Sequence, residues 1–187
     1  MIDFYFVSKL LHVVCAIAWV GGGMTLLANS IFTIADKGET EVLRTLDVMN
    51  GLAKRWFIPA SMLTLIFGAI TATFGGMWTD LWVLLGLAGF ASTFITGIAV
   101  FEPLGKQIEE LVAANQLDAA LVKGRTLLRI AKFDYTVMLV VIADMVLKPY
   151  WSDLIILALF AAILAAGAFF FLLGGKLGST ERATSVQ

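Results

Sequence analysis

Long apolar stretches alternate along the chain with short charged segments. The apolar stretches cover about residues 4–34, 57–77, 81–101, 133–151 and 154–175. About 20 apolar residues in a helix match the ~30 Å hydrocarbon core of a bilayer. The pattern therefore predicts an all-α integral membrane protein with five transmembrane helices in a bundle, embedded in the lipid bilayer. The first stretch is longer than a bilayer requires, so we expect it to tilt or protrude.

The charged segments between these stretches have a helical pattern of their own. Apolar residues recur at helical spacing within residues 36–55 and 106–132, which predicts amphipathic helices on the cytoplasmic membrane surface. We expect residues 1–176 to form a single transmembrane domain and residues 177–187 to be a disordered cytoplasmic tail.

The distribution of basic residues predicts the orientation. Eleven of the 13 Lys and Arg residues lie in the first and third connections and in the tail, which share one side if there are five spans. The other side has Lys148, with Lys9 just inside the first span. Since Lys and Arg concentrate on the cytoplasmic side, the N-terminus is expected outside and the C-terminus in the cytoplasm. An aromatic belt follows on the outer side, formed by Trp78, Trp82, Tyr150 and Trp151.

Composition narrows the chemistry. Hydrophobic residues make up 60% of the chain and charged residues 14%, and the net charge of −1 gives no sign of a nucleic-acid partner. The single cysteine, Cys15, excludes an internal disulfide and any multi-cysteine zinc site. The single histidine, His12, excludes a bis-histidine site within one chain.

Four ionisable residues stand out within the apolar stretches, namely Lys9, His12, Asp144 and Lys148. A charge at the centre of a membrane helix costs roughly 2.5–3.5 kcal/mol on insertion scales, so such residues are retained for packing or for function. In one interpretation both lysines reach the interface, Asp144 pairs with Lys148 and His12 makes one interhelical hydrogen bond. In the other, His12 ligates a haem iron or a transition metal, and Asp144 fixes its second ring nitrogen.

A copper site is a further alternative. His12, Cys15 and Met145 are soft ligands that suit copper(I), although methionines are also common in apolar helices. Asp134, near the inner end of the fourth span, is interpreted as a boundary residue or as a partner of Lys132 or Arg129. The sequence contains no nucleophile motif, phosphate loop or pair of carboxylates that would indicate a particular reaction. The residues alone therefore do not decide whether the chain is an enzyme.

Three segments resemble a known family. The motif Lys9-Leu-Leu-His12, followed by Trp19 and Gly21-Gly22, resembles the opening helix of HemJ-type protoporphyrinogen oxidases, and copper-resistance-protein-D-like membrane proteins have a comparable helix. The segment Arg55-Trp-Phe-Ile-Pro59, with Thr64 and Gly68, is similar to the second HemJ-type helix, and residues 129–134 leading to Lys148-Pro149 look like the closing helix. The pattern of residues 144–149 looks closer still to an uncharacterised family of small bacterial integral-membrane proteins, a domain of unknown function.

The resemblance covers about residues 9–151 and implies haem b bound through His12, with Lys9, Trp19 and Asp144 near it. It departs from the HemJ type in the third span, which has neither His nor Lys, and at Lys132 and Phe133, which replace an Asn-Glu pair. What it implies is therefore a related helical scaffold in a bacterial inner membrane.

The resulting hypothesis is a membrane redox or cofactor-handling protein with an external electron-transfer partner. With one histidine, the second iron ligand has to be Met, Lys, water or a histidine of a second copy, so a homodimer sharing haem is one form of the hypothesis. The alternative is a non-enzymatic small transporter or assembly factor, without haem, whose polar cluster binds metal, proton or lipid.

Overall fold

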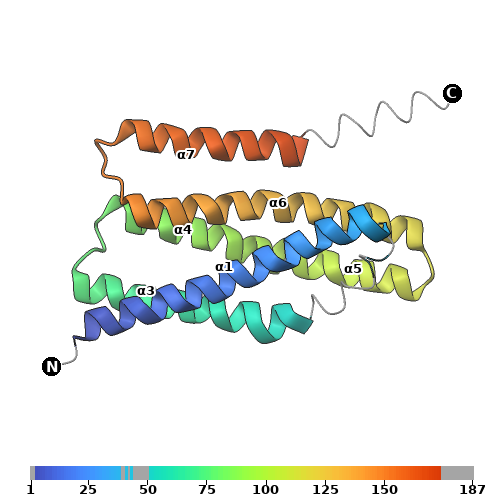
Figure 1. Ribbon diagram of the computed structural model, residues 1–187, viewed down its shortest axis with the longest axis horizontal. Helices are drawn as coiled ribbons and strands as arrows, with labels where there is room; N and C mark the ends of the chain where they lie inside the picture. Colours follow the sequence, from blue (N-terminus) through green and yellow to red (C-terminus); the bar gives the residue numbers. More distant parts are fainter. Residues whose placement is uncertain (1–2, 39–40, 42, 44–50, 174–187) are drawn as a thin grey trace.

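The structure, a computed structural model, describes residues 3–38, 41, 43 and 51–173 and is entirely helical over them (Figure 1). In chain order the helical segments are α1 (Phe4–Lys37), η1 (Ala53–Phe57), α3 (Ile58–Gly75), α4 (Leu81–Thr96), η2 (Gly97–Phe101), α5 (Glu102–Ala113), α6 (Leu117–Leu147), α7 (Leu154–Gly167) and η3 (Ala168–Leu173). The three η segments have π-helical hydrogen bonding. Each continues the helix next to it, so α4, η2 and α5 form one unbroken rod.

Four of the helices are long and apolar enough to cross a membrane. They cover Phe4–Asp36, Arg55–Gly75, Leu81–Ala113 and Leu154–Leu173. Large apolar side chains remain exposed along them, for example Phe4, Ile95 and Ile155, and an aqueous surface would not tolerate such continuous apolar faces. The chain is therefore a polytopic membrane protein, and the predicted association with a lipid bilayer is supported.

The fourth predicted stretch belongs to a longer helix than the sequence pattern suggested. Helix α6 runs without a break from Leu117 to Leu147, so residue 133 is an interior position and not a helix start. The helical period continues through the charged segment before Lys132, which explains why the chain does not turn there. Because of its charges, α6 is not among the four long apolar helices, and a count of five spans stays a prediction.

The helices pack in pairs (Figure 1). Helix α1 lies along α3, and α4 lies against α6. Helix α7 packs on α6, at one side of the bundle. The loops between α3 and α4 and between α6 and α7 lie at the same end. The chain turns between α3 and α4 across Trp78–Asp80, the gap between the second and third apolar stretches, and the turn begins at Gly76, whose φ of 64° is left-handed.

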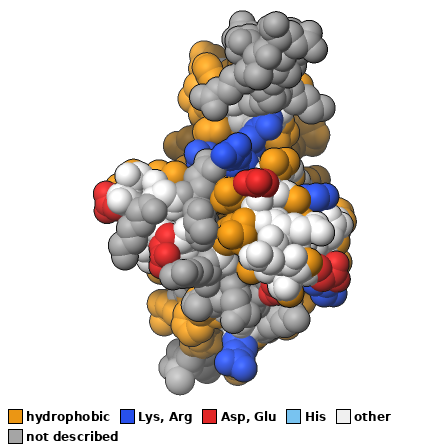
Figure 2. Space-filling model, turned by 90° about the vertical axis from the view of Figure 1, so that its right-hand side faces the viewer, with side chains coloured by type: hydrophobic (Ala, Val, Ile, Leu, Met, Phe, Trp, Pro, Cys, Tyr) orange, Lys and Arg blue, Asp and Glu red, His pale blue; other side chains and the backbone are white. Residues whose placement is uncertain are grey.

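Amphipathic helices form the opposite end of the molecule. Helix α5 and the first half of α6 enclose a small apolar cluster of Leu43, Ile108, Ala120 and Leu127. The amine of Lys123 in α6 donates to Oε1 of Gln107 in α5 at 2.8 Å, and side chains of both charge signs gather over this end (Figure 2). Residues 106–132 are thus helical, as predicted, and their place on the cytoplasmic membrane surface stays a prediction. Residues 39–40, 42 and 44–50 of the segment 36–55 and the tail 177–187 lie outside the described residues.

Candidate functional site

His12 lies at the interface between α1 and α3. Its Nδ1 is 2.7 Å from the backbone carbonyl oxygen of Thr64, 52 residues further along the chain. A carbonyl oxygen can only accept, so Nδ1 carries the hydrogen and donates it. In the neutral ring, Nε2 then holds the lone pair and is the nitrogen able to ligate a metal.

Gly68 of α3 has no side chain, and this leaves room for the imidazole of His12 against the helix. A Cβ at Gly68 would lie 2.9 Å from both Cε1 and Nδ1 of His12, closer than real Cβ atoms approach other heavy atoms. Gly68 is four residues after Thr64, so the two share a helix face. The hydroxyl of Thr64 bonds back to the Ala60 carbonyl oxygen at 2.8 Å, which leaves the carbonyl of Thr64 for His12. Thr64 and Gly68, both residues of the second-span motif, therefore together hold the imidazole in place.

Two further polar contacts tie α1 to the chain segment around α3. The hydroxyls of Ser8 and Thr71 are hydrogen-bonded at 3.0 Å, both within buried residues. At the other end, Nε1 of Trp56 in η1 donates to the backbone carbonyl oxygen of Ala18 at 3.0 Å. Polar side chains in this interface are thus matched with partners from the neighbouring element.

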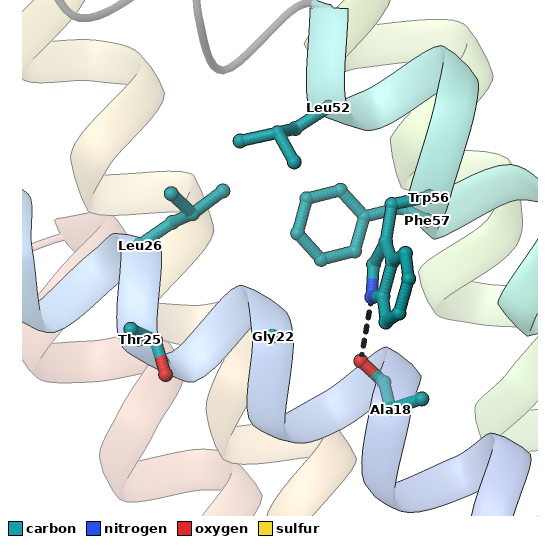
Figure 3. A pocket seen from close by; sticks show the side chains of 7 residues that line it. All are labelled: Ala18, Gly22, Thr25, Leu26, Leu52, Trp56 and Phe57. Carbon is teal, nitrogen blue, oxygen red and sulfur yellow. Dashed lines mark hydrogen bonds between the residues drawn. The ribbon is translucent and has the colours of Figure 1, made fainter.

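An apolar groove of about 320 Å³ lies beside the Trp56 contact (Figure 3). Its walls are Ala18, Gly22, Thr25, Leu26, Leu52, Trp56 and Phe57. The indole of Trp56 forms one side and points its nitrogen at Ala18, while Leu26 and Leu52 face each other across the opening. His12 is not part of the lining; Ala18 follows it by six residues, about 9 Å along a helix axis.

Asp144 is in the other interface, between α6 and α4. Its exposed fraction is 2%, and neither carboxylate oxygen has a hydrogen-bond partner. Oδ2 points toward α4, where a Cβ at Gly86 would be 3.6 Å away. Asp144 therefore does not hold the second nitrogen of His12; the Thr64 carbonyl occupies that role.

The Asp144–Lys148 ion pair of the packing interpretation is not formed in the structure. The ammonium nitrogen of Lys148 lies 5.0 Å from the centre of the Trp82 ring, in a cation–π contact. Lys148 ends α6 with a left-handed φ of 48°. Its side chain is directed to Trp82 of α4 and not back along α6.

The remaining candidate residues have separate surroundings. Lys9 is exposed and lies 5.7 Å from the Tyr5 ring centre, and Trp19 packs edge-on against Phe90 of α4 at 5.3 Å. Cys15 is a half-buried free thiol. Met145 contacts α4 at Gly86, whereas His12 contacts α3. Within the described part of the chain, no three His, Cys, Asp or Glu side chains are grouped as a metal site.

Sequence reasoning missed the burial of Asp134. It is 7% exposed, although it was interpreted as a boundary residue or a partner of Arg129. Arg129 instead donates from Nε to the Phe171 carbonyl oxygen at 2.9 Å and from Nη2 to that of Leu172 at 2.6 Å. The signal available was helical spacing: Asp134 is seven residues before Val141 and eleven before Met145, which both contact α4.

Comparison of the chain with protein-family models, with curated proteins and with solved structures finds no match. The function is therefore inferred from the contacts described above and from the resemblance of the motifs around His12.

Proposed function

We propose that this polytopic membrane protein binds haem b through Nε2 of His12 and serves in membrane redox chemistry or cofactor handling. The proposal includes five spans in a bacterial inner membrane, with the N-terminus outside and the C-terminus in the cytoplasm. The observation that carries it is the 2.7 Å hydrogen bond from Nδ1 of His12 to the Thr64 carbonyl oxygen. A backbone carbonyl on the second ring nitrogen is a common way to orient a metal-ligating histidine.

Two features of the structure support a porphyrin site along α1. The ring is braced between α1 and α3 by Thr64 and Gly68, and the groove further along α1 is lined mainly by apolar and aromatic side chains. Haem b would supply one-electron transfer. The protein would supply one imidazole, and the second position would be filled by Met, Lys, water or a histidine of a second copy. An external protein would act as the electron-transfer partner.

The proposed orientation follows from the charged end of the molecule. Helix α5 and the first half of α6 carry Lys106, Lys123, Arg125, Arg129 and Lys132. The opposite loops carry Lys148 alone. The positive-inside rule then assigns the α5–α6 end to the cytoplasm.

The test is the visible absorption spectrum of the full chain purified in detergent, before and after dithionite. We expect a Soret band that shifts on reduction and is lost in His12→Ala. Leu10→Ala is the matched control, because Leu10 is two residues away in the same helix and exposed; it should keep the band. Colourless protein after expression with ample haem, or a band that survives His12→Ala, would refute the proposal.

A second candidate is a small transporter or assembly factor without haem, favoured by the unpartnered burial of Asp144. Metal analysis of the same purified sample separates a copper site at His12, Cys15 or Met145 from both. Copper that is retained by the wild type and lost in His12→Ala, in colourless protein, would replace haem by copper as the bound group.

A further inference from the structure

Asp144 is enclosed by two helices and yet has nothing to bond. Its carboxylate has an exposed fraction of 2% and no hydrogen-bond partner for either oxygen. Gly86 of α4 lies opposite Oδ2, and the terminal methyl of Met145 fills the remaining space at that glycine. Native proteins satisfy nearly all buried polar atoms, so a pair of unsatisfied carboxylate oxygens calls for an explanation.

The chemistry of this environment selects a proton as the ligand. An ionised carboxylate without a partner is strongly unfavourable in an apolar medium, and such a group neutralises instead. A divalent metal ion would require several further ligands, and the described residues bring no three His, Cys, Asp or Glu side chains together there. A proton requires one oxygen.

The ionisable groups on the neighbouring elements are few. Neither α4 (Leu81–Thr96) nor α7 (Leu154–Gly167) contains one. Near this end are Lys148 at the end of α6, Asp80 before α4, Asp153 before α7, and Lys9 and His12 of α1. The side chain of Asp80 accepts from Trp82 Nε1 at 3.2 Å, and that of Asp153 accepts from the Tyr150 backbone N–H at 2.8 Å.

Lys148 is the cation suited to respond to Asp144. It follows Asp144 by four residues, and its ammonium now rests over the Trp82 ring, 5.0 Å from the ring centre. A cation–π contact at an exposed site is weak, so the ammonium can exchange it for a carboxylate one turn away. Such an exchange would supply the counter-charge that an ionised Asp144 lacks.

We propose that Asp144 is a proton-binding site between α4 and α6, and that Lys148 moves from Trp82 to Asp144 when the proton leaves. The proton passes from the carboxyl oxygen to water at the Pro149 end of α6, and no other bond is made or broken. The site is independent of haem, since His12 has its own partner on α3. It gives the protein a proton-dependent state at its α6–α7 loop end.

The test is a pH titration by infrared difference spectroscopy of the full chain in lipid vesicles. The protonated carboxyl has a C=O stretch of its own, and carbon-13 aspartate identifies it as an aspartate band. We expect an aspartate band that disappears as the pH is raised, because the carboxyl then loses its proton. It should be absent in Asp144→Asn and retained in Asp134→Asn, which removes the other buried carboxyl of α6.

The role of Lys148 has its own readout. Because a nearby cation favours the ionised carboxyl, Lys148→Gln should move the midpoint of the band upward by about one pH unit or more. Lys9→Gln, a lysine in α1 beside Tyr5, should leave the midpoint unchanged. An unshifted midpoint in Lys148→Gln would overturn the coupled movement.

Other outcomes overturn the proton site itself. These are the absence of a titrating aspartate band, a band that persists at all pH values, or a titrating band that survives Asp144→Asn. If Asp144→Asn does not fold, Asp144→Glu replaces it: the titrating band should then persist but lose its sensitivity to labelled aspartate. His12→Ala should leave the titration unchanged even if it abolishes a Soret band, so the two proposals fail separately.

Discussion

Two helix interfaces in this protein bury polar side chains. In one interface these side chains have hydrogen-bond partners, and in the other the buried carboxylate has none. Between α1 and α3, the imidazole of His12 bonds the Thr64 carbonyl oxygen, and the hydroxyls of Ser8 and Thr71 bond each other. Between α4 and α6, Asp144 is buried more deeply than His12 and bonds nothing. Both interfaces use glycine for close approach, Gly68 in the first and Gly86 in the second.

The difference distinguishes polar groups that serve helix packing from polar groups that are candidates for chemistry. A buried polar group that has its partners can be retained for helix association alone, whereas one without partners costs stability and needs another reason to persist. His12 combines a nitrogen that has a partner with one that is available for a ligand: Nδ1 is hydrogen-bonded, and Nε2 is left with a lone pair. Burial alone would not have distinguished Asp144 from Thr71, which is also buried.

The two interfaces meet where α1 crosses α6 and α4. The phenol of Tyr135 in α6 lies against Gly23 of α1, and the ring of Trp19 packs on Phe90 of α4. A change at this junction should therefore affect both helix pairs at once.

The largest effect is expected for Gly23→Ala. A Cβ there would overlap the Tyr135 hydroxyl and lie 2.8 Å from the ring carbon that carries it. Because the phenol is rigid, overpacking should lower the free energy of unfolding by about 1–3 kcal/mol. Thermal unfolding in detergent can be followed with a thiol-reactive dye, since Cys15 is the only thiol in the chain.

Gly21→Ala is the matched control for that substitution. It is two residues away in the same helix, and a Cβ there would meet open space. Replacing an unhindered helical glycine should be neutral or stabilise by up to about 1 kcal/mol. Equal melting temperatures for the two variants would mean that Tyr135 does not join α1 to α6.

A smaller effect should distinguish the two interfaces directly. Gly68→Ala places a Cβ 2.9 Å from two atoms of the His12 ring, a rigid group that Thr64 holds in place, and should cost about 1–2 kcal/mol. Gly86→Ala meets the terminal methyl of Met145, which can change rotamer, and should cost less than 1 kcal/mol. A greater loss in Gly86→Ala than in Gly68→Ala would reverse the comparison.

Much of the fold could be predicted because the bilayer imposes its length on apolar helices. Four of the five apolar stretches are long apolar helices, and the turn across Trp78–Asp80 is where the pattern placed it. The exception is α6. Its charged and apolar halves have the same helical period, and the change in polarity near Lys132 was interpreted as a boundary although the backbone continues.

The candidate site was predictable in its residues and less so in its partners. His12 and Asp144 stood out because ionisable groups are rare in hydrocarbon. The partner of His12 is a backbone carbonyl, which every residue has, so residue identity could not reveal it. Gly68 was the one visible sign, since a glycine four residues after Thr64 leaves room for a ring. The burial of Asp134 required knowing that α6 is one helix.

The smallest effect concerns the hydroxyl pair of the α1–α3 interface. Ser8 and Thr71 are hydrogen-bonded at 3.0 Å, and each also lies within hydrogen-bond distance of a carbonyl oxygen in its own helix, Tyr5 for Ser8 and Phe67 for Thr71. Each single variant, Ser8→Ala or Thr71→Val, therefore leaves the remaining hydroxyl with a partner.

Interhelical hydrogen bonds in membrane proteins average about 0.6 kcal/mol. A double-mutant cycle should give a coupling free energy of that size. Zero coupling would mean that the bonds within each helix satisfy both hydroxyls, and the contrast with Asp144 would then depend on His12 alone.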